Sequence, residues 1–126
     1  MIGSYNKHQR LKKKKDIARI FADGSSVLFY PLLFRWRFVS SPTSPNLLYG
    51  VGVPKRKIRK AVHRNLIKRR MREAFRLNKS ELESTLEAKD GQLQVMTIFI
   101  AKETLGYDKI ESATIKGLRH LSDKYR

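Results

Sequence analysis

The spacing of hydrophobic residues first predicts the strands of this chain. Within residues 32–41, aromatic and cationic residues alternate, which is the period of a half-buried strand with a cationic outer face. Pro31 cannot donate to a sheet ladder, and it is expected to separate this strand from a shorter one at residues 26–30. A third strand is expected at residues 47–53. A nearly continuous apolar run predicts a fourth strand at residues 92–101, covered on both faces.

Helical spacing is visible in the segments around these strands. Apolar residues with a basic lead-in predict a short amphipathic helix that ends before Gly24. Ser80 and Glu83 form a capping-box pattern that predicts a further helical turn or two. A C-terminal helix is expected to begin with Asp108 as its N-cap and Glu111 three residues later.

The predicted elements follow the order αβββαβα when the basic segment at residues 55–79 forms the central helix. This order predicts an α+β fold, a two-layer sandwich of helices on one mixed four-stranded sheet. The length favours a single domain over residues 1–126, because the chain is too short for two ordinary hydrophobic cores. Residues 1–10 are expected to form a flexible basic segment.

Residues 55–79 form the most basic part of the chain, with Glu73 as their sole acid. On a helical wheel of about 100° per residue, one arc holds the apolar residues expected to contact the sheet, namely Ile67, Met71, Ala74 and Phe75. The adjacent arc, which we call the cationic stripe, holds Asn65, Lys68, Arg69, Arg72 and Arg76, with Arg64 at the boundary between the arcs. The helix is therefore expected to pack through one side and to present cations on the next.

The whole chain shares this positive charge, since 28 Lys and Arg oppose 11 Asp and Glu for a formal net charge of +17. A hydrophobic core does not require that excess. A polyanionic partner explains it, because basic side chains neutralise phosphates and release their counterions. Arginine can bond two phosphate oxygens, and Asn65 can read a base edge or a ribose 2'-hydroxyl. Nucleic acid is therefore the expected partner.

Two other interpretations of the basic helix are weaker. A solvated helix face usually mixes both signs of charge for pairing along the helix, and this face has almost no acid to pair with. A DNA-binding or nuclear-localisation basic region is expected with heptads or a recognisable turn before the helix, and the sequence shows neither.

Several classes of protein and site are disfavoured by composition. No apolar run approaches the roughly 18 to 20 residues of a membrane-spanning helix, and residues 1–15 lack the apolar centre of a signal peptide. Cysteine is absent, which excludes disulfides and thiolate metal sites. The histidines are scattered without partners at metal-ligand spacing: His8, His63 and His120. A cytoplasmic protein without a membrane partner is expected.

Residues 61–76 resemble the signature of the bacterial ribonuclease P protein family, which runs A-V-x-R-N-R-x-K-R-x-x-R-E-x-F. The resemblance extends to the family's first helix through Leu11-Lys12-Lys13 and to its third strand through residues 49–53 followed by Lys55. It covers nearly the whole chain in the family's order of elements.

Four residues depart from the family's pattern. Leu66 stands where the signature has its second arginine, so one RNA contact is expected to be weaker. Arg59-Lys60 replaces a common Gly-Asn pair, and Ile17 replaces an aromatic of the first helix. The loss of that aromatic would leave Phe21 as the expected platform for base stacking.

The resemblance implies a division of the RNA-binding surface. The central helix would bind the ribonuclease P RNA subunit through Arg64, Asn65, Lys68, Arg69, Arg72 and Arg76. A cleft between the first helix and the sheet would hold the 5' leader of precursor tRNA, with Lys12, Lys13, Phe21, Arg35 and Arg37 as contacts. The family also implies a left-handed crossover between the two parallel strands, although ordinary rules predict a right-handed one.

The resemblance implies that the protein carries no catalytic residue. Mg²⁺ held mainly by the RNA subunit would perform the hydrolysis, with none bound by the protein alone and no DNA as partner. Two rivals remain to be distinguished. A small ribosomal protein would share the charge and size without a reason for this signature, and a protein-only endonuclease would need converging carboxylates. The one dense acidic cluster comprises Glu81, Glu83, Glu87 and Asp90, in a helix and its exit turn.

Overall fold

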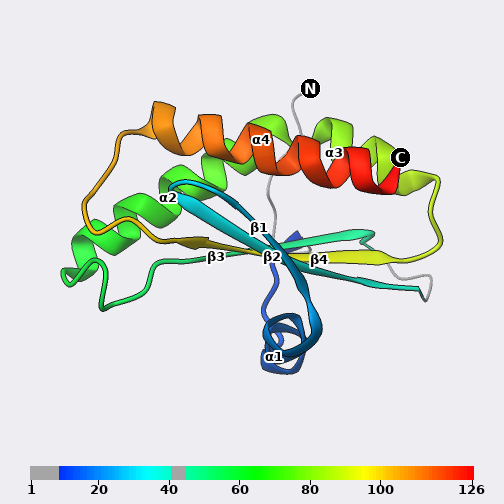
Figure 1. The fold of residues 1–126 in the computed structure, drawn as a ribbon, viewed down its shortest axis with the longest axis horizontal. Coiled ribbons are helices and arrows are strands. Elements are labelled where there is room, and N and C mark those ends of the chain that lie inside the picture. Colours follow the sequence, from blue (N-terminus) through cyan, green and yellow to red (C-terminus); the bar gives the residue numbers. More distant parts are fainter. Residues whose placement is uncertain (1–8, 41–44) are drawn as a thin grey trace.

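The computed structural model describes residues 9–40 and 45–126, which form helices on both faces of one sheet (Figure 1). In chain order the elements are α1 (Lys14–Asp23), β1 (Ser25–Phe29), β2 (Leu32–Val39), β3 (Leu47–Gly52), α2 (Ala61–Asn78), α3 (Ser80–Glu87), β4 (Gln92–Phe99) and α4 (Tyr107–Tyr125). The sheet has α2, α3 and α4 on one face and α1 on the other (Figure 1). Of the segment expected to be flexible, residues 1–10, residues 1–8 lie outside this description, while Gln9 is buried and Arg10 forms a parallel bridge with Tyr49 of β3.

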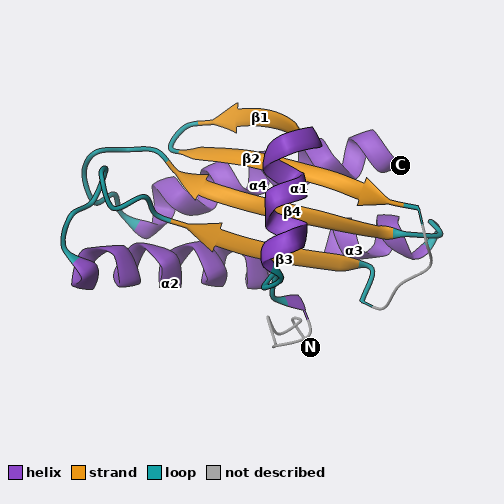
Figure 2. Cartoon of the chain, turned by 90° about the horizontal axis from the view of Figure 1, so that it is seen from below, coloured by secondary structure: helices purple, strands orange, loops and turns teal. Residues whose placement is uncertain are grey.

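The strands form a mixed four-stranded sheet in the order β1-β2-β4-β3 (Figure 2). β2 pairs antiparallel with β1 and with β4, and β3 pairs parallel with β4. The predicted α+β fold and its sheet are therefore confirmed. The N-terminal segment also follows the outer edge of β3, where the amide of Leu11 donates to the carbonyl of Tyr49 at 3.1 Å.

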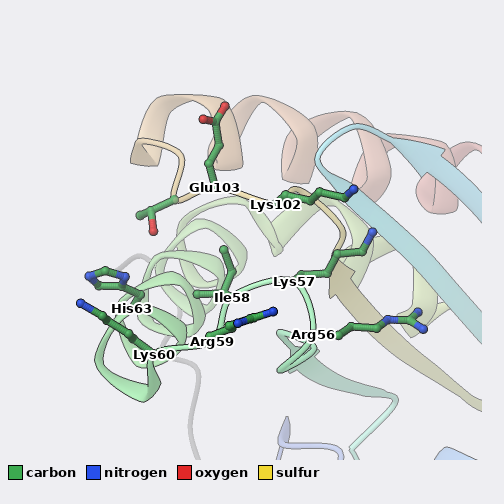
Figure 3. A pocket seen from close by; sticks show the side chains of 9 residues that line it. Arg56, Lys57, Ile58, Arg59, Lys60, His63, Lys102 and Glu103 are labelled. Carbon is green, nitrogen blue, oxygen red and sulfur yellow. The ribbon is translucent and has the colours of Figure 1, made fainter.

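The crossover from β3 to β4 through α2 and α3 is left-handed. When Figure 2 is turned so that β3 and β4 point upward, β4 lies to the right of β3 and the two helices lie behind the sheet. A right-handed crossover would place them in front. The segment expected to be wholly helical also begins differently, because residues 55–60 form a loop before α2 that lies beside the β4–α4 connection (Figure 3).

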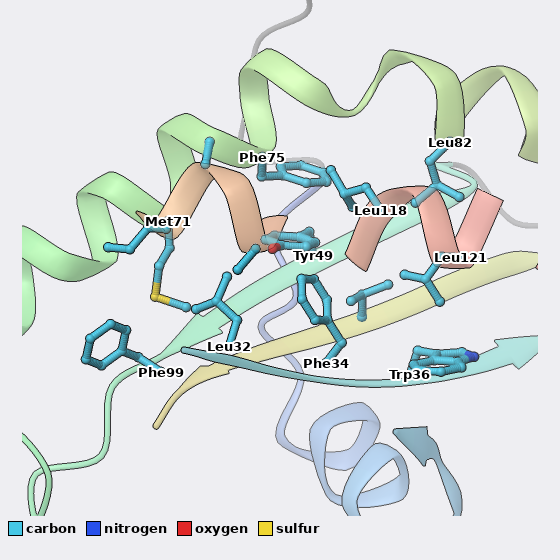
Figure 4. Packing of buried hydrophobic residues seen from close by; sticks show 14 of the residues in the cluster. Leu32, Phe34, Trp36, Tyr49, Met71, Phe75, Leu82, Phe99, Leu118 and Leu121 are labelled. Carbon is cyan, nitrogen blue, oxygen red and sulfur yellow. The ribbon is translucent and has the colours of Figure 1, made fainter. Parts of the chain in front are cut away.

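The core lies between the sheet and its three-helix layer (Figure 4). The arc predicted to pack is buried as expected, with Ile67, Met71, Ala74 and Phe75 as the buried residues of α2. The ring of Phe75 stacks on that of Tyr49 from β3, with centroids 3.8 Å apart. Phe34 and Trp36 of β2 face the same layer. Burial of this apolar arc and of alternate strand residues fixes both the register of the sheet and the position of α2.

Both predicted capping boxes are wrong, because the N-cap residues are Lys79 for α3 and Gly106 for α4, and neither helix has a side-chain cap. Glu83 lies within reach of Lys79 and Gln9, and the nearly buried Lys79 amine donates to the Gln9 amide oxygen at 2.5 Å. At the other helix, α4 begins at Tyr107 rather than after Asp108. Glu111 accepts one hydrogen bond from the Tyr107 hydroxyl within α4 and another from the side-chain amide of Asn78, and the second bond joins α4 to α2.

Burial and the hydrogen bond to Glu111 raise the pKa of Tyr107 to about 12. The folded protein therefore holds this phenol proton more tightly than the unfolded chain does. The contribution to stability is complete below the ordinary pKa of 10.0 and is lost as the pH rises toward 12.

Gly117 of α4 lies directly against the ring of Phe34, and a Cβ at this position would overlap that ring. We expect Gly117→Ala to lower the free energy of unfolding by about 1 to 2 kcal/mol, because the overpacking penalty exceeds the gain in helix propensity. Urea denaturation measures the change. Lys116→Ala, at the neighbouring exposed position, should stay within about 0.5 kcal/mol of the parent. A Gly117→Ala protein as stable as the parent would contradict the packing described.

Candidate nucleic-acid interface

Helix α1 crosses the open face of the sheet and is attached there by the two arginines of β2. Arg35 donates to the carbonyl of Phe21 at 3.0 Å and lies 3.5 Å from that of Ile20, so it satisfies the C-terminal end of α1. Arg37 donates to Gln94 at 2.8 Å and to Asp16 of α1 at 3.4 Å. The predicted cationic outer face of β2 is therefore covered by α1 rather than open to solvent.

A groove remains on the part of this face that α1 leaves uncovered. Leu28, Leu33, Ile98 and Gly52 lie in one row across the four strands. The groove has a volume of about 560 Å³, and its lining residues are Phe21, Leu33, Gly52, Val53, Pro54, Arg56, Lys57, Lys68, Met96, Ile98 and Ile100. An apolar floor between an aromatic edge and a cationic edge suits a single nucleic-acid strand, whose bases stack while its phosphates meet cations.

The two glycines of β3 have different surroundings, and of the two it is Gly52 that lines the groove. Gly50 is buried, and a Cβ there would lie 2.9 Å from the Met96 sulfur and 3.2 Å from the Cβ of Leu11. The protein's own N-terminal segment therefore approaches the sheet closely at Gly50. Gly52 lines the groove, so the absence of a side chain keeps its floor low.

The residues predicted for the leader cleft lie at different places around α1. The Phe21 side chain is 45% exposed on the edge of the groove, with the Arg35 guanidinium 5.6 Å from its ring centroid. Lys12 and Lys13 are exposed just before the start of α1, at the opposite end of the helix from Phe21. Arg35 and Arg37 lie between helix and sheet. The structure thus brings together Phe21 and Arg35, while Lys12 and Lys13 would extend the surface along α1.

The cationic stripe of α2 follows the predicted arc, with differences in how free its members are. Asn65 and Arg69 are exposed, and Lys68 and Arg72 are half-buried. Arg76 forms a two-pronged ion pair with Glu73, with atoms 2.5 Å and 3.1 Å apart. This pair lowers the pKa of Glu73, chiefly through the hydrogen bond, so Arg76 is the stripe residue already bound to an acid.

Arg64 points back from α2 onto the loop before it. Its guanidinium donates to the carbonyl of Ile58 at 3.0 Å and to that of Arg59. These bonds hold the loop at residues 55–60 against the first turns of α2. Arg64 therefore shapes the surface around the start of the stripe, in addition to any contact it makes itself.

Lys68 connects the stripe to the groove, because it belongs to the first and lines the second. The residues that sequence reasoning missed are those of the opposite groove edge and floor, Arg56, Lys57, Met96 and Ile98. The sequence shows the charge of Arg56 and Lys57, but its pattern predicts that both belong to one continuous helix over residues 55–79. The β4 residues belong to an apolar run whose two faces have no polar alternation, so nothing marked which face was open.

Neither metal-ligand clusters nor membrane spans were found in the described part of the chain. No group of three or more His, Asp or Glu residues among residues 9–40 and 45–126 is arranged to hold a metal ion. No helix among them has the length and hydropathy needed to cross a membrane.

Comparisons with known proteins agree on one family. The sequence profile of the family described as Ribonuclease P matches residues 5–124. A Ribonuclease P protein component of Porphyromonas gingivalis is 31% identical over 113 residues, which cover 90% of this chain and 82% of that protein. A Ribonuclease P protein component of Chlorobium phaeobacteroides is 35% identical over 107 residues, with coverage of 79% and 73%.

Solved structures show the same fold. The RNase P protein of Staphylococcus aureus superposes with a TM-score of 0.67 at 23% identity, covering 95% of this chain and all of that one. The RNase P protein of Thermotoga maritima gives a TM-score of 0.64 at 25% identity, covering 88% of this chain and 96% of that one.

The contacts of Arg64 predict a role in ordering the loop. Arg64→Lys keeps the charge but cannot reach both carbonyls with one planar group, so we expect faster hydrogen exchange of the amides at residues 55–60. We also expect a loss of about 1 kcal/mol in the free energy of unfolding. The matched change Arg69→Lys, on the exposed part of α2, should alter neither measurement. Equal exchange in the two variants would mean that the loop is held by other contacts.

Proposed function

The chain belongs to the bacterial ribonuclease P protein family, and from that membership we propose that it is the RNA-binding subunit of a ribonuclease P ribonucleoprotein. The family places it in the maturation of tRNA 5' ends. In the proposal, the cationic stripe binds the catalytic RNA and the groove binds the 5' leader of precursor tRNA. The observation that carries this division is the presence of two adjacent surfaces of different chemistry, joined at Lys68.

The chemistry of the groove supports the leader as its occupant. Its floor is apolar and includes Met96 and Ile98, and Phe21 offers an exposed ring at its edge. Such a surface accepts bases through stacking and holds the backbone through phosphate contacts, both of which tolerate variation in sequence. The leader of a precursor is a single strand of variable sequence. A duplex would not fit the same row of side chains, because its bases are already stacked in pairs.

The stripe suits a structured RNA. Asn65 and Arg69 project from the exposed side of a rigid helix, and the neighbouring Arg72 is half-buried at the same surface. Guanidinium groups in one row can bind successive phosphates, and Asn65 can select a base edge or a 2'-hydroxyl. Leu66 lies on the flank of the helix rather than within the stripe, so its departure from the family pattern removes a contact at the margin.

The proposed role of the protein in the reaction is positioning. Ribonuclease P activity hydrolyses a phosphodiester, which releases the leader and leaves a 5' phosphate on the tRNA. Mg²⁺ held mainly by the RNA subunit would supply the hydrolytic chemistry. The side chains of this protein would hold the leader and the catalytic RNA in one orientation, which raises the rate without a protein nucleophile or general base. Such a complex would act in the bacterial cytoplasm, on RNA rather than DNA.

Reconstitution tests the proposal as a whole. The purified chain should stimulate cleavage of precursor tRNA by a ribonuclease P RNA at low magnesium concentration, because its cations offset the repulsion between the two RNAs. The protein without RNA should release no leader. Cleavage by the protein alone would contradict the assignment of catalysis to the RNA, and the absence of stimulation would contradict the proposed subunit role.

The stripe predicts a specific loss of affinity for the catalytic RNA. We expect Arg69→Ala with Arg72→Ala to weaken binding and to reduce the salt dependence by about one to two counterions. Filter binding over a range of salt concentrations measures both quantities. Lys89→Ala with Lys124→Ala removes the same charge at the far end of the molecule and should leave the slope nearly unchanged. An unaltered slope in the stripe variant would mean that the stripe faces solvent in the complex.

The groove predicts a loss that depends on the leader. Phe21→Ala should weaken binding of precursor tRNA to the reconstituted complex by about fivefold, since one base–aromatic stack contributes about 1 kcal/mol or more. The binding of mature tRNA should not change. The matched control is Val62→Ala, which removes an exposed apolar side chain of α2 outside the groove. Equal losses for precursor and mature tRNA would place Phe21 outside the leader site.

A further inference from the structure

A second hollow, which we call the basic pocket, lies where the loop before α2 meets the β4–α4 connection (Figure 3). It has a volume of about 500 Å³, and its lining includes Arg56, Lys57, Arg59, Lys60, His63 and Lys102. None of the stripe residues lines it. The pocket is built from two chain segments far apart in sequence, of which the loop before α2 supplies Arg56, Lys57, Arg59 and Lys60, and the β4–α4 connection supplies Lys102.

Among the described residues, the cations of the basic pocket form no ion pair with an acid. Glu103 is the one carboxylate at its rim, and its side chain points away from the cations toward α4 (Figure 3). Like charges held around one hollow repel each other, and a bound anion removes that repulsion.

The start of α2 borders the basic pocket, because Lys60 and His63 are among its lining residues. Lys60 is the N-cap residue and gives no side-chain cap, and the first turn carries no acid. The amides of His63 and Arg64 both bond to the carbonyl of Lys60, which leaves those of Ala61 and Val62 without a partner inside the helix. The positive end of the helix dipole therefore lies beside the pocket and favours an anion there. Lys57, Arg59 and Lys102 supply the charge that the helix end alone would lack.

The basic pocket continues from the groove, because Arg56 and Lys57 line both. A strand lying on Met96 and Ile98 would therefore pass these two cations as it leaves the sheet. We propose that the basic pocket binds a backbone phosphate of the RNA strand that occupies the groove, beyond the last base that stacks there. This assignment rests on the proposed function of the groove and adds to it a second, more distant contact with the leader.

Leader length separates this contact from those within the groove. Two precursor tRNAs that differ only in leaders of about four and about twelve nucleotides would be bound to the complex of protein and catalytic RNA. Arg59→Ala with Lys102→Ala should weaken binding of the long-leader precursor by about three- to tenfold and reduce its salt dependence by about one counterion. The short-leader precursor should lose less than about twofold, because its strand ends before the pocket.

Two further variants serve as controls. Arg59→Lys with Lys102→Arg keeps both charges and should restore binding of the long leader. Lys89→Ala with Lys124→Ala removes equal charge far from the pocket and should leave both precursors unaffected. The affinity of each protein for the catalytic RNA without precursor is measured in parallel and should be the same.

Three results would overturn the inference: no loss for the long leader, equal losses for both leaders, or a loss confined to binding of the catalytic RNA alone. A loss confined to the catalytic RNA would mean that the phosphate bound in the pocket belongs to the catalytic RNA and not to the leader. Failure of the proposed function looks different, because the parent protein would then gain no affinity from either leader. If the parent protein gains affinity from the leaders and the pocket variant binds both precursors equally well, the proposal for the pocket is rejected while the proposed function stands.

Discussion

The attachment of α1 to the sheet by Arg35 and Arg37 is the interaction on which the binding surface depends. Arg35 satisfies carbonyls at the end of α1, and Arg37 reaches Asp16 while it also bonds Gln94 of β4. These contacts hold a short helix across the middle of the sheet's open face (Figure 2). If α1 covered the whole face, there would be no groove. If it were detached, Phe21 would lose its fixed place at the edge of the groove, and ordering it on binding would cost affinity.

The left-handed crossover determines how the two proposed RNA surfaces meet. It puts α2 on the face opposite α1, close to the edge formed by β3, with its apolar arc on the core (Figure 2). The next arc of the helix then turns outward past that edge, and Lys68 reaches the groove on the other face. One rigid helix can therefore contact a structured RNA while its flank contributes to a site for a single strand. The loop that Arg64 fixes extends the same continuous basic surface.

The sequence predicted most of the architecture because buried positions in helices and strands carry apolar residues at a regular spacing. The core arc of α2 and the alternation of β2 were predicted residue by residue, since packing selects apolar side chains at those spacings. Contacts between distant segments produce no such spacing in the sequence. The bond from Gln9 to Glu83, the bond from Asn78 to Glu111 and the covering of Arg35 by α1 all depend on tertiary proximity. Likewise, the apolar run of β4 did not show that Ile98 faces a groove.

The central claim, that the groove holds the leader while the stripe faces the catalytic RNA, can be tested by proximity. The chain has no cysteine, so Ile98→Cys and Arg69→Cys each provide a single attachment point for a tethered cleavage reagent. Mapping of RNA cuts in the complex with precursor tRNA and catalytic RNA gives the answer. The reagent at position 98 should cut the leader, and that at position 69 should cut the catalytic RNA. Cuts from position 98 confined to the catalytic RNA or to the mature part of the tRNA would contradict the account.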